Sequence, residues 1–344
     1  MSGELSESFM VSSDSPLVVE VTRGRLVESR HRGAAVVSDG EGAILARWGE
    51  VDRPVFARSA VKPIQALPLI ETGAAEGFEL GDAELALAAA SHVAAPEHLA
   101  ELERWMARIG VGVGDLECGV HPPLDAGTAA ALAREGRAPS ALHNNCSGQH
   151  LGFLATAIHE REPKRGYIGR DHPVQRRVRA VLSAYVGRDL GSASEAIDGC
   201  GIPTLALPLT ALARAMARFA RPEGLGPARA AAAGRLWAAI VNRPDMLAGS
   251  GRVNTQLIEA GRGGLIVKGG YEGVYLAALR ARGIGVALKI EDGAKRAAEA
   301  AIAALLVRLG ALTDGTPACV PAELLNCANR PVGSVRVRWP EPRA

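Results

Sequence analysis

Residues 263–293 have the sequence GGLIVKGGYEGVYLAALRARGIGVALKIEDG. They contain three short apolar runs, at 265–267, 274–279 and 284–290, which are separated by glycine-rich turns. Runs of this length bounded by glycine predict β-strands joined by hairpins. Similar runs lie near the N-terminus, at 17–24, 34–39 and 43–48, and a last one lies at 333–339. We therefore expect strands from both ends of the chain to pair in one antiparallel sheet.

Between these strands the apolar residues repeat with helical spacing, and glycine, proline or charged residues bound the repeats. We expect helices over 62–73, 82–92, 96–110, 125–136, 146–162, 172–187, about 207–219 and about 226–241, and one more over about 294–309. The fold class is thus mixed α/β (α+β), an antiparallel sheet flanked by a mainly helical lobe. We expect residues 1–16, rich in Ser, Asp and Glu, to form a mobile tail. Residues 17–344 should form a single two-lobed domain whose helical lobe spans about 62–260.

The charge balance favours a small-molecule ligand. The chain of 344 residues has 39 basic and 37 acidic side chains, a net charge of +2, and only 4% aromatic residues. This predicts neither a nucleic-acid partner nor binding to an anionic membrane, since both require a basic surface. The N-terminus has no basic or apolar region typical of a signal peptide, and no run of about 18 apolar residues occurs. We expect a cytoplasmic protein.

The five cysteines are widely spaced, and a chain of this length does not need disulfides for stability. We expect them to be reduced. Cys118, Cys319 and Cys327 are interpreted as small buried or half-buried residues without chemistry.

Ser59-Ala-Val-Lys62 is the only Ser-x-x-Lys sequence in the chain, and it lies where strand patterns give way to helical ones. A spacing of three residues places both side chains on one helix face, so Lys62 could accept the proton of Ser59 during nucleophilic attack. A lysine acts as a base only when burial or a second positive charge lowers its pKa. So short a motif also arises by chance, and Pro63 restricts Lys62, although proline is tolerated in the first turn of a helix.

Two further segments are similar to parts of serine β-lactamases and penicillin-binding proteins. Lys268-Gly-Gly follows an apolar run and resembles their Lys-Thr-Gly strand, with the glycines allowing a ligand to approach the backbone. Ser91 lies at the end of the helix predicted at 82–92, where those enzymes have a middle serine. Taken singly, the first segment is as well explained by a turn and the second by a serine at a helix end.

Polar and nucleophilic residues concentrate in two loops, His143-Asn-Asn-Cys-Ser-Gly-Gln-His150 and Asp198-Gly-Cys-Gly-Ile-Pro203. Their thiols, Cys146 and Cys200, could bind Zn²⁺ together with two other groups. No Cys-x-x-Cys spacing supports a structural metal site, so the residues alone leave the metal open.

Taken together, these motifs resemble the Rhizobium-type L-asparaginase family, often called asparaginase II. They occur in the family's order, and the resemblance covers about residues 17–340. The segments are HRGAAVV at 31–37, RSAVKPIQALPLI at 58–70, ASH at 90–92, GVHPPL at 119–124, HNNCSGQH at 143–150, HPVQ at 172–175, DGCGIPT at 198–204, AGSGRVNT at 248–255 and KGGYEGVY at 268–275.

The resemblance implies a fold similar to serine β-lactamases and glutaminases, a homodimer, and hydrolysis of L-asparagine to L-aspartate and ammonia without an organic cofactor. It makes Ser59 and Lys62 a first catalytic pair and makes Ser91 and Lys268 a second pair in the same pocket. It leaves open which serine attacks, although Ser59 with Lys62 as its base is our first hypothesis. The substrate-binding residues that it implies, for the α-carboxylate, the α-amino group and neighbouring polar atoms, are Arg58, His150, Asp198 and Cys146.

The family also binds zinc beside the substrate through two cysteines and a lysine. The cysteines match Cys146 and Cys200, but Gln149 replaces the lysine. An amide oxygen is a weak zinc ligand beside thiolates, so we expect the metal to be bound more weakly, to be absent or to be completed differently. The lost positive charge also keeps a second hypothesis open, a hydrolase of glutamine, a β-aspartyl derivative or another small amide. A third hypothesis is a non-catalytic protein whose two thiols and polar loops bind an amino acid or a metal.

Overall fold

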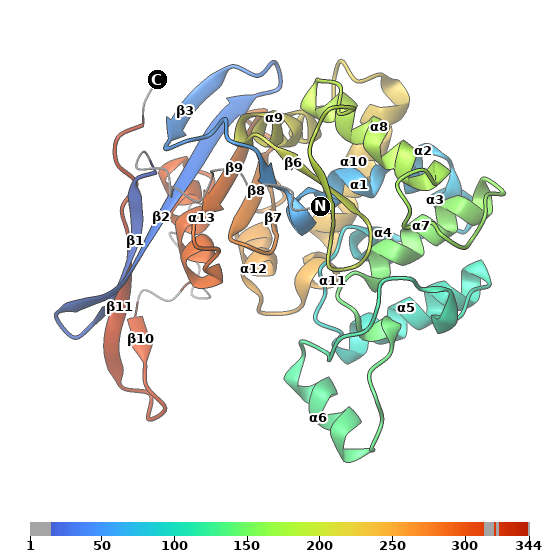
Figure 1. Ribbon diagram of the computed structural model, residues 1–344, viewed down its shortest axis with the longest axis horizontal. Coiled ribbons are helices and arrows are strands. Elements are labelled where there is room, and N and C mark those ends of the chain that lie inside the picture. Colours follow the sequence, from blue (N-terminus) through green and yellow to red (C-terminus); the bar gives the residue numbers. More distant parts are fainter. Residues whose placement is uncertain (1–14, 313–319, 321–322, 343–344) are drawn as a thin grey trace, which may run out of the picture.

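The computed structural model describes residues 15–312, 320 and 323–342. Its eight-stranded antiparallel sheet has the strand order β10-β11-β1-β2-β9-β8-β7, and β3 pairs with β2 beside this path (Figure 1). The strands are β1 (Leu17–Arg23), β2 (Leu26–Asp39), β3 (Ile44–Trp48), β7 (Leu265–Gly269), β8 (Val274–Leu279), β9 (Ile284–Ile290), β10 (Glu323–Leu325) and β11 (Pro331–Val337). The predicted pairing of strands from both ends of the chain is confirmed.

The register shows how the two ends of the chain meet. Val19 in β1 pairs with Val337 in β11, and β2 pairs with β9 from Gly33 opposite Ile290 to Asp39 opposite Ile284. These pairings join residues about 250 to 320 positions apart in sequence, so the sheet depends on contacts between segments that are distant along the chain.

Helices cover both faces of the sheet. In β2, Ala34 and Val36 pack into one hydrophobic cluster with the central helices, whereas Ala35 and Val37 pack into a second cluster with α13 (Lys295–Arg308). Successive side chains of a strand point to opposite faces, so a continuous apolar run is what a sheet buried on both faces needs.

The central helices begin on the first of these faces. Helix α9 (Leu209–Ala220) packs against β9 at Gly285, where an added Cβ would lie only 1.9 Å from Ala213 O. The remaining helices form the mainly helical part of the chain, as expected: α1 (Lys62–Gln65), α2 (Leu67–Glu71), α3 (Ala74–Gly77), α4 (Asp82–Ala88), α5 (Pro96–Ile109), α6 (Ala126–Arg134), α7 (Ser147–His159), α8 (Pro173–Val186), α10 (Pro227–Asn242), α11 (Pro244–Ala248) and α12 (Val253–Ala260).

The structure differs from the expected elements in several places. Helices α3, α11 and α12 and strand β10 were not predicted, and the helix predicted over 82–92 ends at Ala88. The helix predicted over 62–73 is broken at Ala66 into α1 and α2, because Pro68 has no N–H to donate to the helix ladder and disfavours helical geometry before it. A small sheet of β4 (Val55–Phe56), β6 (Pro203–Leu207) and β5 (Glu195–Ile197) was not predicted. Its strands are too short for a periodic pattern, yet its β5–β6 turn contains Asp198 and Cys200.

Of the cysteines that were expected to be inert, Cys118 is buried as predicted. Cys327 is exposed between β10 and β11, so its predicted burial is wrong; the turn there projects from the sheet, and no other helix or strand of the described residues covers it. Cys319 and residues 1–14 of the predicted tail lie outside the described residues. No helix in the described part of the chain has the length and apolar character needed to span a membrane.

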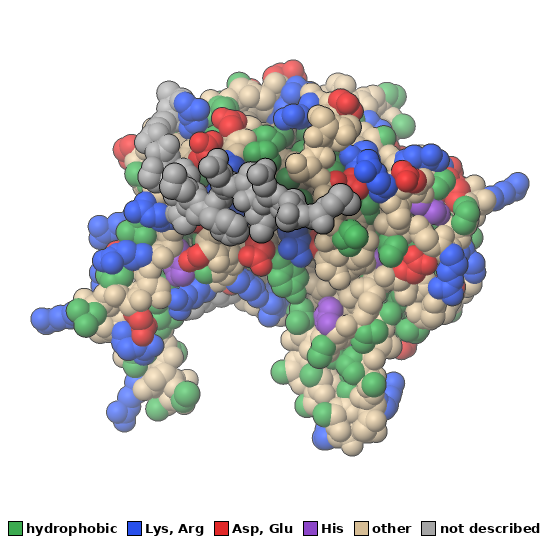
Figure 2. Space-filling model, viewed as in Figure 1, with side chains coloured by type: hydrophobic (Ala, Val, Ile, Leu, Met, Phe, Trp, Pro, Cys, Tyr) green, Lys and Arg blue, Asp and Glu red, His purple; other side chains and the backbone are tan. Residues whose placement is uncertain are grey.

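The space-filling view shows the surface hollowed between two projections (Figure 2). Comparison with Figure 1 identifies one projection as α6 and the other as the β10–β11 end of the sheet.

Candidate active site

Ser59 lies in a 3₁₀ turn, Arg58–Val61, that leads directly into α1. Pro63 occupies the first turn of α1, which agrees with the expected helix-start position. The segment after β7 packs against this turn at Gly270, where an added Cβ would lie 3.0 Å from Ala57 O and 3.1 Å from Ala60 N. The glycines after Lys268 therefore let the chain's own backbone approach, and this contact brings the end of β7 to the Ser59 turn.

Ser91 lies between two lysines. Its Oγ is 2.9 Å from Lys268 Nζ and 3.4 Å from Lys62 Nζ. Both lysine side chains are buried. Burial, together with the positive charge of Lys62, holds the pKa of Lys268 well below its ordinary value. A neutral amine in contact with a hydroxyl can take its proton, which is the property of a general base.

Lys62 is held by three acceptors. Its Nζ donates to Ala90 O at 2.7 Å and to Cys146 Sγ at 3.0 Å, besides the contact with Ser91. These three contacts match the three N–H donors of an ammonium group. Among the described residues no hydrogen bond joins Lys62 to Ser59, and the Ser59 hydroxyl has no partner there.

The two thiols that the sequence singled out lie side by side. Cys146 immediately precedes α7, and Cys200 lies in the β5–β6 turn. A hydrogen bond from the Cys200 thiol, helped by the charge of Lys62, lowers the pKa of Cys146 to about 5 against the opposing effect of burial. The same hydrogen bond and burial raise the pKa of Cys200. The two pKa values move in opposite directions, so Cys146 is the more acidic thiol of the pair.

Ser59, Ser91 and Lys268 line one cavity of about 370 Å³. The other residues that line it are Leu124, Asn145, Ala248, Arg252, Val253, Asn254, Gly269, Gly270, Tyr271, Glu272, Gly273, Tyr275, Gly293, Lys295, Ala298 and Glu299. The structure thus brings both predicted serines and one predicted lysine to the same cavity. Lys62 does not line the cavity, but it contacts Ser91, which does.

Arg58 and Asp198, which were expected to bind substrate, bind each other. Arg58 Nε and Nη2 lie 2.8 Å and 2.7 Å from Asp198 Oδ1, and the guanidinium also lies over the ring of Tyr271, 5.8 Å from its centre. Neither side chain lines the 370 Å³ cavity. Arg58 has φ +49°, a backbone conformation that residues with a side chain rarely adopt and that is often found at functional sites.

His150, also expected to bind substrate, is fully buried in α7. Its Nδ1 lies 2.8 Å from the Tyr167 hydroxyl, and its Nε2 is buried without a partner in the described part of the chain. Burial lowers the pKa of His150 to about 3, so the ring is neutral. It does not line the cavity and contacts none of the predicted catalytic side chains through a hydrogen bond.

Gln149, at the position of the family's zinc-binding lysine, faces another glutamine. Its Nε2 donates to Gln65 Oε1 at 2.9 Å, while its own Oε1 is buried without a partner among the described residues. Within residues 15–312, 320 and 323–342, no group of three or more His, Cys, Asp or Glu side chains could hold a metal ion. Zinc sites use three or four protein ligands, so two thiols fall short, and we derive no step through zinc.

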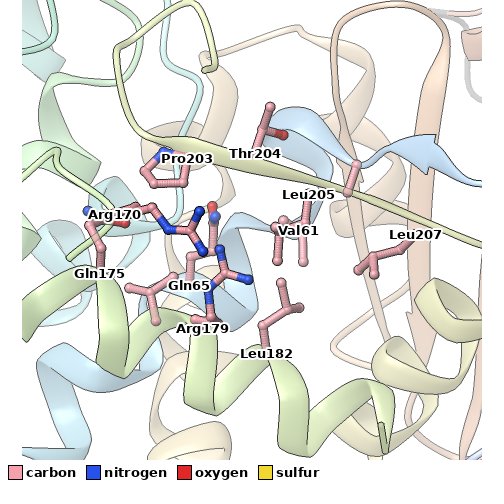
Figure 3. Close-up of a pocket in the computed structure, with 12 residues that line it drawn as sticks. Val61, Gln65, Arg170, Gln175, Arg179, Leu182, Pro203, Thr204, Leu205 and Leu207 are labelled. Atoms are coloured by element: carbon pink, nitrogen blue, oxygen red, sulfur yellow. The ribbon is translucent and has the colours of Figure 1, made fainter. Parts of the chain in front are cut away.

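A second cavity, of about 30 Å³, lies between α8 and β6 (Figure 3). Figure 3 shows Arg170, Arg179 and Gln65 turned toward one another in it. Both arginines form ion pairs with Glu195, and the space is too small for an amino acid. We therefore place the active site in the larger cavity.

Three further polar residues line the cavity, and none of them was assigned a role from the sequence: Arg252, Asn254 and Asn145. The first two lie in the motif AGSGRVNT, and Asn145 lies in the polar loop 143–150. What distinguishes them is their position on the cavity wall, and only the folded chain shows it.

A sequence model of the L-asparaginase II family matches residues 19–337. Among solved structures, a β-lactamase from Mycobacterium bovis is 16% identical over 78% of this chain and 89% of its own, with a TM-score of 0.33. A mutant of simvastatin synthase from Aspergillus terreus is 8% identical over 78% of this chain and 87% of its own, with a TM-score of 0.32. No curated protein matches the sequence.

Proposed function

The chain belongs to the L-asparaginase II family, and from this premise we propose that it hydrolyses the side-chain amide of L-asparagine to L-aspartate and ammonia. The observation that carries the proposal is the contact of Ser91 Oγ with Lys268 Nζ, 2.9 Å long, in a cavity that Ser59 also lines. Amide hydrolysis needs a nucleophile and a base that is neutral at working pH, and this cluster supplies candidates for both.

In the proposed mechanism Ser59 Oγ attacks the side-chain carbonyl carbon of asparagine, since its hydroxyl has no partner among the described residues and faces the cavity. The proton of Ser59 passes through Ser91 to Lys268. When the C–N bond breaks, Lys268 returns this proton to the leaving ammonia. Water then hydrolyses the aspartyl ester on Ser59, which restores the hydroxyl and releases L-aspartate. Lys62 supports the transfer by donating to Ser91.

The test is ammonia release from L-asparagine by the wild type, by Ser59→Ala and by Ser91→Ala, together with peptide mapping of acid-quenched reactions. We expect Ser59→Ala to lose about 10³-fold or more in kcat, because an essential nucleophile is removed. The aspartyl ester should map to Ser59, and Ser91→Ala should still form it slowly. Ser183→Ala is the matched control, because Ser183 lies on α8 outside the lining of the cavity. Its hydroxyl donates to Arg188 O.

An ester on Ser91, or full activity in Ser59→Ala, would reverse the roles of the serines. Binding of asparagine without release of ammonia would favour the non-catalytic alternative.

A different small amide is the second candidate substrate, and two observations favour testing it. Gln149 stands where the family has a lysine, and a cavity of about 370 Å³ is in the range of pockets that hold ligands larger than asparagine. Comparing kcat/KM for L-asparagine, L-glutamine and a β-aspartyl peptide decides between them. The homodimer and the cytoplasmic location stay predictions.

A further inference from the structure

Helix α12 begins beside the cavity with an exposed arginine, Arg252, whose guanidinium has no partner among the described residues. Arg252 immediately precedes α12 and lines the cavity together with Ser59, Ser91 and Lys268. Its backbone is fixed, since its N–H donates to Gly249 O and its carbonyl accepts from Gln256 N. Its guanidinium, however, forms no hydrogen bond, ion pair or ring contact with any described residue. A guanidinium carries five N–H donors in a geometry that matches a carboxylate.

Asn254, two residues further, offers an acceptor. Its Oδ1 is buried and has no hydrogen-bond partner among the described residues, and the residue lines the same cavity. A buried acceptor without a partner is costly and rare in folded proteins, so it calls for an explanation. A bound ligand that donates an N–H to Oδ1 is such an explanation.

The backbone adds to the positive character of this wall. The first N–H groups of α12 have no acceptor inside the helix, and the helix dipole favours negative charge at this end. Of the other charged side chains that line the cavity, Lys295 lies 3.6 Å from Glu299, Lys268 contacts Ser91, and Glu272 is exposed. Within the described part of the chain, Arg252 thus brings an unpaired donor group and Asn254 an unpaired acceptor to the cavity wall.

We propose that Arg252 binds the α-carboxylate of the substrate and that Asn254 Oδ1 accepts a hydrogen bond from its α-ammonium group. An α-amino acid has this pair of charges on one carbon, and Arg252 and Asn254 lie on one short stretch of chain. Arg58 and Asp198, which the sequence assigned to the same task, are bound to each other and lie outside the lining of the cavity. A substrate that used them would first have to break their ion pair. The inference rests on the proposed function for the identity of the substrate as an amino-acid amide.

The test uses two compounds that each lack one charge of asparagine. 3-Aminopropanamide is asparagine without its α-carboxylate, and succinamic acid is asparagine without its α-amino group. We expect Arg252→Met to lower kcat/KM for L-asparagine about 10- to 100-fold, mainly through KM, the usual effect of losing a charge-assisted hydrogen bond. It should leave turnover of 3-aminopropanamide unchanged. Arg252→Lys should recover part of the loss.

The corresponding experiment applies to Asn254. Asn254→Leu should weaken turnover of L-asparagine and leave that of succinamic acid unchanged. Gln256→Met, on the same helix but outside the lining of the cavity, controls for general damage to α12. The inference is overturned if Arg252→Met affects L-asparagine and 3-aminopropanamide equally. It is also overturned if Arg58→Met, and not Arg252→Met, removes the preference for the carboxylate.

A binding measurement separates this inference from the proposed function. Isothermal titration of wild type and Arg252→Met with L-aspartate, succinate and β-alanine needs no turnover. If the wild type hydrolyses no amide, and Arg252→Met binds L-aspartate and succinate more weakly than the wild type does, the binding role of Arg252 stands and the proposed function fails. If the wild type binds neither L-aspartate nor succinate, the binding role of Arg252 is wrong whatever the protein hydrolyses.

Discussion

Ser91 Oγ lies 2.9 Å from Lys268 Nζ, although 177 residues separate the two in the sequence. The serine follows helix α4, and the lysine belongs to strand β7 of the large sheet. The loop of Ser91 is tied from both sides, because Ser91 N donates to Leu247 O and His92 N donates to Asn145 O. The contact is therefore held by the backbone of three separate segments, and it can be perturbed at one side chain without loss of the fold.

Lys268→Met should remove the base and keep most of the packing of this buried side chain. We expect kcat to fall about 10²- to 10⁴-fold, the usual contribution of general acid–base catalysis. The reason is that Lys268, whose pKa burial lowers, is the amine in contact with Ser91. Ammonia release measured against pH checks this, because wild-type activity should fall as the pH drops and Lys268 becomes protonated.

Lys289→Met is the control for this variant, since Lys289 is also a strand lysine whose pKa burial lowers, but it bonds only backbone carbonyls. Equal losses in both variants would mean that Lys268 acts on stability and not on the reaction.

Lys268 should also make stability depend on pH. Its pKa is lower in the folded protein than its ordinary value of 10.5, so between these two values the unfolded chain binds more protons than the folded one. The free energy of unfolding should therefore rise with pH across this window, and the penalty of burying the lysine should be largest below it. Denaturant titrations of wild type and Lys268→Met at several pH values measure the difference. A difference that stays constant from neutral pH to about pH 10 would show that the pKa is not lowered.

Cys200→Ala should raise the pKa of Cys146 from about 5 toward its ordinary value of 9.0, because the hydrogen bond from Cys200 is the largest cause of the lowering. The fraction of thiolate at neutral pH should fall accordingly, which the ultraviolet absorbance of the thiolate reports as a function of pH. Cys118→Ala is the matched control: burial raises the pKa of Cys118 to about 12, so its removal takes away no thiolate near neutral pH. Identical titration curves for wild type and Cys200→Ala would contradict the assignment.

Gln149→Lys should raise the affinity for Zn²⁺. Gln149 follows Cys146 by three residues at the start of α7, so the two positions share a helix face, and a neutral amine there would add a third ligand to two thiols. We expect an increase of about 10-fold or more, in line with what single groups around metal sites contribute. Competition with a chelator measures it, and Gln149→Leu, which adds no ligand, is the comparison. Equal zinc affinity in Gln149→Lys and wild type would show that position 149 does not control the metal.

Much of the fold followed from local patterns. The apolar runs of β1, β7, β8 and β9 and the helical periodicity of α5, α8 and α13 were local signals, and each element formed where it was predicted. The small sheet of β4, β5 and β6 was missed because β4 and β5 have only 2 and 3 residues and β6 runs almost directly into α9. The burial predicted for Cys327 was wrong because burial depends on what other segments cover a residue, and no local pattern contains that information.

By itself, the sequence determined the order of the helices and strands, the pairing of N- and C-terminal strands in one sheet, and the family to which the chain belongs. It also named Ser59, Lys62, Ser91 and Lys268, because their chemistry and spacing are local properties. Only the tertiary structure decided which groups touch. It placed Ser91 in contact with both lysines and paired Arg58 with Asp198. It also placed Arg252 on the cavity wall without a side-chain partner among the described residues. The physical reason is that hydrogen bonds and ion pairs act over about 3 Å, and which side chains come that close is fixed by packing between distant segments.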